Sequence, residues 1–194
     1  RLFRPVESSD LKRRYGIDGS QPLVGYTGRH SHEKYLQELI AAVDGMDVTL
    51  VLAGDGPARA ELERQADGVD CEIVFPGFLD RGELPAFYSM LDVFAFAGRI
   101  ETQGLVALEA NACGTPVVAV DAGALAHTVV DGRTGYHYPP GDIAAFSEAI
   151  GRTIAEVGRL REHCLERRER VSVEHTLDRL TRLYDRLLDS ACAA

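Results

Sequence analysis

The stretch "DVFAFAGRIETQGLVALEANACGTPVVAV", residues 92–120, contains a complete strand–helix–strand pattern. Residues 92–98 are a short apolar run that ends in glycine, as expected for a buried strand. Residues 103–113 are expected to form a helix, which Gly114 would close as its C-cap. A second apolar run, residues 115–120, provides the next strand. This order predicts two parallel strands joined by a crossover helix.

The same alternation of apolar runs and helical patterns continues in both directions. In residues 33–43, Leu36, Leu39, Ile40 and Val43 recur at the helical period. Further strands are expected at residues 22–28, 47–56, 71–77 and 135–139, and further helices at 57–66, 81–91, 123–130, 142–157, 158–170 and 174–189. We therefore expect an α/β fold, with a Rossmann-like parallel sheet of about six strands and helices on both faces.

The beginning of the chain differs from the rest. Residues 1–21 mix proline, serine and charged residues without a clear period. We expect this segment to be a linker that enters the domain, and residues 22–194 to form the domain itself.

Composition and charge exclude several classes of function. Hydrophobic residues make up 45% of the chain and charged residues 26%, the usual balance of a globular protein. The net charge of −9 argues against binding nucleic acid by bulk attraction. No apolar run reaches about 18 residues, so no transmembrane helix is expected. The four cysteines fit no zinc-site spacing, and His30 and His32 lack a supporting cluster, so we expect reduced thiols, a cytoplasmic protein and no metal site.

The candidate site follows the strand at residues 92–98, because ligands of such sheets bind beyond the carboxyl ends of the strands. The helix expected from about Gln103 begins with amide groups that have no partner within the helix, and its dipole adds positive charge there. That end favours phosphate. Gly104 has no Cβ that would keep a diphosphate away from these amides.

Two glutamates flank this helix end. Glu101 precedes the helix, and Glu109 lies within it with its side chain leaning back toward the N-terminus. Carboxylates repel a diphosphate but accept hydrogen bonds from a vicinal diol such as that of ribose, which favours hydroxyl binding. The alternative for Glu109 is an ordinary solvated helix residue. Arg29 and Lys34, after the first strand, are placed to meet the phosphates, although Lys34 alone is more often a surface charge.

These residues resemble the C-terminal, donor-binding domain of retaining GT-B glycosyltransferases of family 4, group 1. The resemblance rests on the spacing from Glu101 to Glu109, with "EANACGTPVVA" following, and it covers nearly the whole chain. Four further segments match in order: "GYTGRHSHEK" (25–34), "LVLAGDGPARAELE" (50–63), "FPGFLDRGELPAFYSMLDVF" (75–94) and "VVDGRTGYHYPPGD" (129–142). The chain departs from the family at "GALAH" (123–127), where His127 replaces a usual glutamate and receives no role.

The resemblance implies roles for the matched residues. Glu101 would be the catalytic residue and would hydrogen-bond hydroxyls of the donor sugar, while Glu109 would hold the ribose hydroxyls. Arg29 and Lys34 would bind the diphosphate. The other donor-binding residues would be Gly28 and Thr102 in the loops, Gln103, Gly104 and Leu105 through their amides, and Phe78 and Leu79 in the base pocket.

A domain of this kind binds a nucleoside-diphosphate sugar as co-substrate and needs neither a cofactor nor a divalent metal. The resemblance implies a parent enzyme that transfers a hexose-type sugar to a glycan, lipid or small-molecule acceptor. We expect the N-terminal acceptor domain to lie outside this chain, so the chain alone should be inactive. The expected location is the cytoplasm, and the alternative is a cytoplasmic enzyme in peripheral contact with the inner face of the membrane.

Two alternatives stay open, half of a GT-B sugar-nucleotide epimerase and a non-catalytic nucleotide-binding module. A dinucleotide-dependent oxidoreductase is disfavoured because no GxGxxG follows the first strand.

Overall fold

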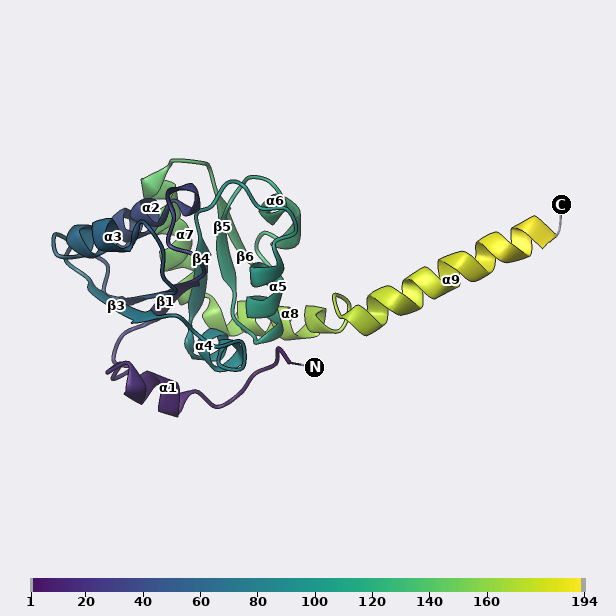
Figure 1. Ribbon diagram of the computed structural model, residues 1–194, viewed down its shortest axis with the longest axis horizontal. Helices are drawn as coiled ribbons and strands as arrows, with labels where there is room; N and C mark the ends of the chain where they lie inside the picture. The colour runs from purple at the N-terminus through teal and green to yellow at the C-terminus, as the bar shows by residue number, and fades with distance from the viewer. Residues whose placement is uncertain (1, 193–194) are drawn as a thin grey trace.

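The centre of the molecule is a six-stranded parallel sheet with the order β3-β2-β1-β4-β5-β6 (Figure 1). The computed structural model describes residues 2–192, and side chains as far as residue 188. The strands are β1 (Leu23–Thr27), β2 (Thr49–Ala53), β3 (Glu72–Gly77), β4 (Val93–Phe96), β5 (Val117–Val120) and β6 (Gly135–Tyr138). All neighbouring pairs are parallel. The predicted fold class is confirmed.

Helices cover both faces of this sheet (Figure 1). On one face lie α2 (Leu36–Val43), α3 (Arg59–Ala66) and α7 (Ile143–Ala155), and on the other α4 (Leu84–Met90), α5 (Leu105–Ala112) and α8 (Val157–Arg168). The short helix α6 (Leu125–Thr128) lies beside β5 and α5. All residues of β2, β4 and β5 are buried, which explains why these strands read as continuous apolar runs.

The strand order reverses beside β1. The chain runs from β1 outward to β2 and β3, then returns to place β4 on the other side of β1. Val24 pairs with Val93 and Gly25 with Phe94, so the two strands lie in register side by side. The chain leaves β1 and β4 toward helices on opposite faces of the sheet, and folds of this kind form their ligand-binding crevice at such a point, at the carboxyl ends of the strands. The fold thus places the candidate site between the loops after β1 and β4.

Two local features differ from the pattern read in the sequence. The segment read as a linker contains helix α1 (Ser9–Arg14), which contacts α4, and its side chains Leu11 and Ile17 are buried in the core. The helix expected at residues 33–43 is divided into a 3₁₀ turn, η1 (His32–Lys34), and α2, because Tyr35 between them adopts a left-handed conformation with φ of 52°.

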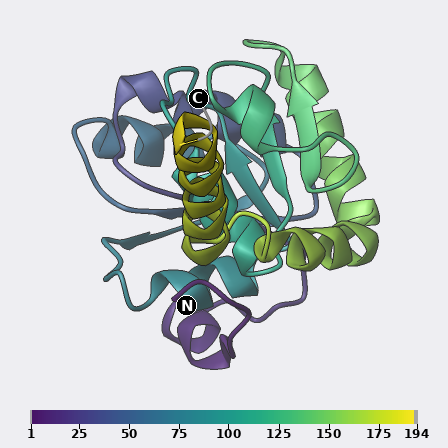
Figure 2. The same ribbon diagram turned by 90° about the vertical axis from the view of Figure 1, so that its right-hand side faces the viewer.

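The last helix, α9 (Val173–Cys192), projects away from the rest of the molecule (Figures 1 and 2). It repeats leucine at helical spacing, and Leu177, Leu180, Leu187 and Leu188 are all exposed. In the part of the chain that the structure describes, no helix combines the length and apolar character needed to cross a membrane.

Candidate functional site

The residues after β1 and β4 meet at the crevice. Lys34, on η1, is half-buried, and its Nζ lies 5.6 Å from the ring centre of Phe96, the last residue of β4. Arg29 lies five positions before Lys34 and is exposed, and the Tyr26 hydroxyl donates to the Arg29 carbonyl at 3.4 Å. Gly28 has no room for a side chain, since a Cβ there would lie 2.6 Å from the Tyr26 hydroxyl oxygen. The structure therefore brings Lys34 to the strand that leads into the Glu101 loop.

Helix α5 begins one to two residues later than the sequence indicated, at Leu105. Its N-cap is Gly104, in a left-handed conformation with φ of 64° that glycine adopts without strain. A Cβ at Gly104 would lie 2.9 Å from the Thr128 hydroxyl, so α6 also closes that position to larger residues. No side chain caps the helix start, so its first amides are available for an anion.

The Glu101 carboxylate lies against the backbone amides just before α5. Its Oε1 accepts a hydrogen bond from the Thr102 amide at 3.0 Å and longer ones from the Gln103 and Gly104 amides, each at 3.4 Å. Successive amides that converge on one oxygen form a nest that suits an anion. The nest includes two of the three amides assigned to phosphate from the sequence, and here a carboxylate of the chain itself occupies it.

Glu109 has a different environment, on the second turn of α5. It is partly buried, and its Oε2 accepts a hydrogen bond of 3.0 Å from the Tyr88 hydroxyl on α4. Burial raises the pKa of the Glu109 carboxyl, an effect that the Tyr88 hydrogen bond and the charge of Arg81 partly offset. A carboxylate with one fixed donor retains acceptor positions for further hydroxyl groups.

The two residues predicted for the base pocket differ in exposure to solvent. Phe78, directly after β3, is 81% exposed, which is unusual for a large aromatic side chain and leaves its ring free to stack on a ligand. Leu79 is only 6% exposed and belongs to the hydrophobic core. Because β2 separates β3 from β1, Phe78 lies at the outer end of the crevice.

Three residues near Lys34 were not singled out in the sequence. Arg99 lies with its guanidinium 4.2 Å from the Tyr35 ring centre and donates to Glu38 at 2.6 Å. These contacts hold Tyr35 in its left-handed conformation, which costs free energy for a residue other than glycine. They fix the turn that carries Lys34. The only available signal was a charged residue in the glycine-rich loop "AGRIETQG", which does not identify its partner.

His30, which the sequence raised only as a possible metal ligand, has a packing role in the structure. It is 0% exposed, and neither ring nitrogen has a hydrogen-bond partner among the described residues. The imidazole lies between the Tyr26 and Phe75 rings, 6.4 Å from each ring centre. Burial is the main cause that lowers the pKa of His30. It therefore packs as a neutral ring beneath the loop after β1.

Replacing His30 with phenylalanine should reduce the loss of stability in acid. Below a pKa of about 6.5 the unfolded chain takes up a proton at this position that the folded chain excludes, so the free energy of unfolding falls with falling pH. With an unfolded-state pKa of about 6.5, this contribution is at most about 1.4 kcal/mol at pH 5.5. The nearby Ala53 backbone partly opposes this by raising the pKa, Arg59 lowers it further, and the charges of Asp55 and Glu63 raise it. Urea unfolding of both proteins at pH 7.5 and 5.5 measures the difference, and an equal loss in both would contradict it.

Within residues 2–192, no group of three or more His, Cys, Asp or Glu side chains is arranged to hold a metal ion. The crevice instead offers a backbone amide nest, one lysine, one arginine and two carboxylates. This combination suits a ligand that carries phosphate and hydroxyl groups together.

Comparison with known proteins defines the class. Residues 7–171 match the sequence profile of the family described as glycosyl transferases group 1. The chain belongs to this family. Its six-stranded sheet is the Rossmann-like sheet of GT-B glycosyltransferases, and the structure aligns with sucrose-phosphate synthase of Thermosynechococcus elongatus with a TM-score of 0.82, 31% identity and coverage of 97% of this chain and 50% of that one.

Particular relatives act on different substrates. The chain is 33% identical over 171 residues to the 2-deoxystreptamine N-acetyl-D-glucosaminyltransferase of Streptomyces fradiae, covering 82% of this chain and 41% of that protein. It is 36% identical over 166 residues to a GDP-mannose-dependent alpha-(1-6)-phosphatidylinositol monomannoside mannosyltransferase of Mycolicibacterium smegmatis, covering 78% and 43%. Anabaena HepE, solved in complex with UDP-glucose, aligns with a TM-score of 0.79 and 26% identity, covering 97% and 54%. The chain spans about half the length of these relatives.

Proposed function

We propose that this chain is the donor-binding half of a retaining glycosyltransferase of family 4 that uses a nucleoside-diphosphate sugar. In this proposal it is the C-terminal half, and the remainder of the parent enzyme, an N-terminal domain, holds the acceptor. Family membership and the match over about half of the relatives' length support this division. The observation that carries the proposal is the amide nest before α5, which already binds a carboxylate and lies at the strand-order reversal.

The diphosphate would displace the Glu101 carboxylate from the nest. Its oxygens would then take the amides of Gln103, Gly104 and Leu105 together with the positive end of α5. Lys34 and Arg29, on the opposite wall, would offset the phosphate charge. The displaced Glu101 side chain, one residue from the nest, would turn toward the sugar attached to the second phosphate and accept its hydroxyl hydrogens.

The remaining residues would hold the nucleoside. Glu109 would accept hydrogen bonds from the ribose hydroxyls while Tyr88 fixes its orientation through the 3.0 Å hydrogen bond. Phe78 would stack on the base, because its ring is exposed. Leu79, being buried, would support the loop from below rather than touch the base over a large area.

Transfer in the parent enzyme would proceed on one face of the sugar. The bond from the anomeric carbon to the phosphate oxygen would break as the acceptor oxygen forms its bond on the same face, and the acceptor proton would pass to the departing phosphate. The nest, Lys34 and Arg29 would stabilise the charge that develops on the diphosphate. Glu101 would position the sugar, and no metal ion is needed for these steps. We place the parent enzyme in the cytoplasm, with contact at the inner membrane face where the acceptor is a lipid.

The donor base is the first property to test. One relative is named as GDP-mannose-dependent and another was solved with UDP-glucose, so uridine and guanosine diphosphates are the first candidates. A thermal-shift screen of this chain against UDP, GDP, ADP and their sugars should show one base raising the melting temperature, because a ligand that binds only the folded state stabilises it. We expect a dissociation constant between about 10 μM and 1 mM for this half alone. The proposal would be contradicted if the folded chain showed no shift in melting temperature with any of these compounds and no binding of them in calorimetry.

Replacing Glu109 with alanine should weaken nucleoside-diphosphate binding by roughly 10- to 150-fold, since a hydrogen bond to a charged group contributes about 1.5–3 kcal/mol. The original chain should bind the 2′-deoxy form of the diphosphate more weakly than the ribose form, because the missing hydroxyl is the partner of Glu109. The Glu109→Ala variant should bind the two forms equally well. Glu162→Ala, on the exposed side of α8, is the matched control and should change nothing. Calorimetry of the four combinations tests the pairing, and an equal loss for both nucleotides would exclude ribose as the partner of Glu109.

A further inference from the structure

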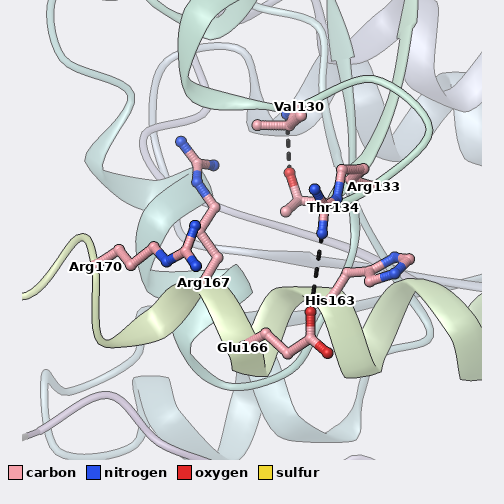
Figure 3. A pocket seen from close by; sticks show the side chains of 7 residues that line it. All are labelled: Val130, Arg133, Thr134, His163, Glu166, Arg167 and Arg170. Atoms are coloured by element: carbon pink, nitrogen blue, oxygen red, sulfur yellow. Dashed lines mark hydrogen bonds and ion pairs between the residues drawn. The ribbon is translucent and has the colours of Figure 1, made fainter.

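A second concentration of positive charge lies away from the crevice, between α8 and the connection from α6 to β6 (Figure 3). It is a pocket of about 230 Å³ whose charged lining consists of Arg133, Arg167, Arg170, His163 and Glu166. Three arginines and one glutamate leave two positive charges in excess, without counting His163. The chain as a whole carries −9, so this excess opposes the overall charge.

Among the described residues, no carboxylate forms an ion pair with Arg167. It is partly buried, and its Nη1 donates to the Thr128 carbonyl at 2.6 Å. Burial lowers the pKa of the Arg167 guanidinium, and the one group that acts in the opposite direction is Cys164 rather than a carboxylate. A partly buried charge is costly unless it is paired.

The other side chains add unmet hydrogen-bonding capacity. Figure 3 shows Arg170 reaching back along the surface toward Arg167. The single carboxylate, Glu166, lies 3.9 Å from Arg133, and both are about two-thirds exposed, so that pair is weak. The Nδ1 atom of His163 is buried and has no hydrogen-bond partner within the described residues.

We propose that this pocket binds a phosphate group between Arg167 and Arg170, with His163 and Arg133 at its side. A doubly charged phosphate matches the excess of two charges, and arginine forks bind its oxygens in pairs. The volume holds one phosphate with a small substituent or several waters. The ligand is either a free or soluble phosphate ester, or the phosphate of a lipid headgroup.

The pocket is separate from the amide nest but connected to it. The Thr128 carbonyl receives the Arg167 hydrogen bond, and the Thr128 hydroxyl contacts the Gln103 carbonyl at 3.3 Å, at the loop that leads into α5. None of the side chains that line this pocket lies in the amide nest, so each site can be changed without removing a side chain from the other. This separation matters because phosphate would also compete for the nest.

Titration with inorganic phosphate in chloride buffer, followed by calorimetry, tests the pocket in the 194-residue chain. The Arg29→Met/Lys34→Met background weakens the crevice, and addition of Arg167→Met/Arg170→Met should reduce the remaining phosphate affinity at least tenfold. Arg64→Met/Arg179→Met removes the same charge from exposed positions outside the pocket and should have no comparable effect. Glu166→Gln removes the pocket's carboxylate and its weak ion pair with Arg133 but keeps all three arginines, so it should raise the affinity severalfold.

Vesicles identify the source of the phosphate. Co-sedimentation with phosphatidylcholine vesicles that contain phosphatidic acid, lost in Arg167→Met/Arg170→Met, would assign a lipid headgroup. Phosphate binding in calorimetry without vesicle binding would assign a soluble ester. The proposal is overturned if phosphate affinity is unchanged in both Arg167→Met/Arg170→Met and Glu166→Gln, with circular dichroism confirming that both variants are folded.

Discussion

Replacing Glu101 with alanine is expected to lower sugar transfer by the parent enzyme roughly 100-fold or more while leaving its affinity for the bare nucleoside diphosphate unchanged or higher. One charge-assisted hydrogen bond contributes about 1.5–3 kcal/mol, which corresponds to about 10- to 150-fold in rate, and a carboxylate has oxygens for two. Affinity is retained because Glu101 occupies the amide nest and must leave before phosphate enters. Removing a side chain that competes with the diphosphate for the same amides does not weaken binding of the diphosphate.

The Glu101→Gln variant keeps the size of the side chain and removes its charge, so it tests which of the two matters for transfer. The amide oxygen of glutamine still accepts hydrogen bonds from the nest, so the nucleotide affinity of this variant should stay near that of the original. Transfer should still fall, because a neutral amide is a weaker acceptor for the sugar hydroxyls. Steady-state kinetics at saturating donor, together with calorimetry of the bare diphosphate, distinguishes the two effects. A loss of diphosphate affinity with normal turnover at saturation would mean that Glu101 holds the nucleotide instead of the sugar.

Replacing Lys34 with methionine should weaken nucleoside-diphosphate binding by roughly 10- to 150-fold and leave binding of the plain nucleoside unchanged. Its ammonium is held over Phe96 at the crevice, so it meets phosphate without a large ordering cost. Arg29→Met should have a smaller effect, because Arg29 is exposed and screened by solvent. The contribution of both should decline as ionic strength rises.

The sequence offers a matched control for this experiment. Lys12, on α1, is the other lysine of the chain, and Lys12→Met removes the same charge far from the crevice. Calorimetry of the three variants against diphosphate and nucleoside compares them directly. An equal loss for diphosphate and nucleoside in Lys34→Met would indicate a defect in folding, and an effect of Lys12→Met as large as that of Lys34→Met would indicate nonspecific attraction.

The sheet could be predicted from the sequence because β2, β4 and β5 are buried on both faces. Residues 117–120 are apolar at every position, a pattern that fits either a buried strand or a buried helix. The run is short, which favours the strand. For the first helix after β1, the helical period was predicted correctly, but the division of the segment into η1 and α2 was not. Tyr35 interrupts it with a positive φ that depends on Arg99, a residue 64 positions further along the chain. Local patterns carry no information about such a contact.

The position of the site could be predicted, but the arrangement of its side chains could not. Strand ends and Gly104 located the crevice because parallel sheets bind ligands there. The return of the Glu101 carboxylate to its neighbouring amides depends on loop conformation, and the burial of Leu79 beside the exposed Phe78 depends on which side of the loop faces the core. The roles of Arg29, Lys34, Glu101 and Glu109 stay predictions until ligand binding is measured.

The central claim is that the backbone amides before α5 hold the diphosphate. Nuclear magnetic resonance of the ¹⁵N-labelled chain, titrated with the nucleoside diphosphate selected by thermal shift and separately with its nucleoside, tests this directly. We predict that the amide resonances of residues 102–105 shift strongly with the diphosphate and little with the nucleoside. Shifts that leave residues 102–105 unchanged, or that are the same for both compounds, would contradict the account.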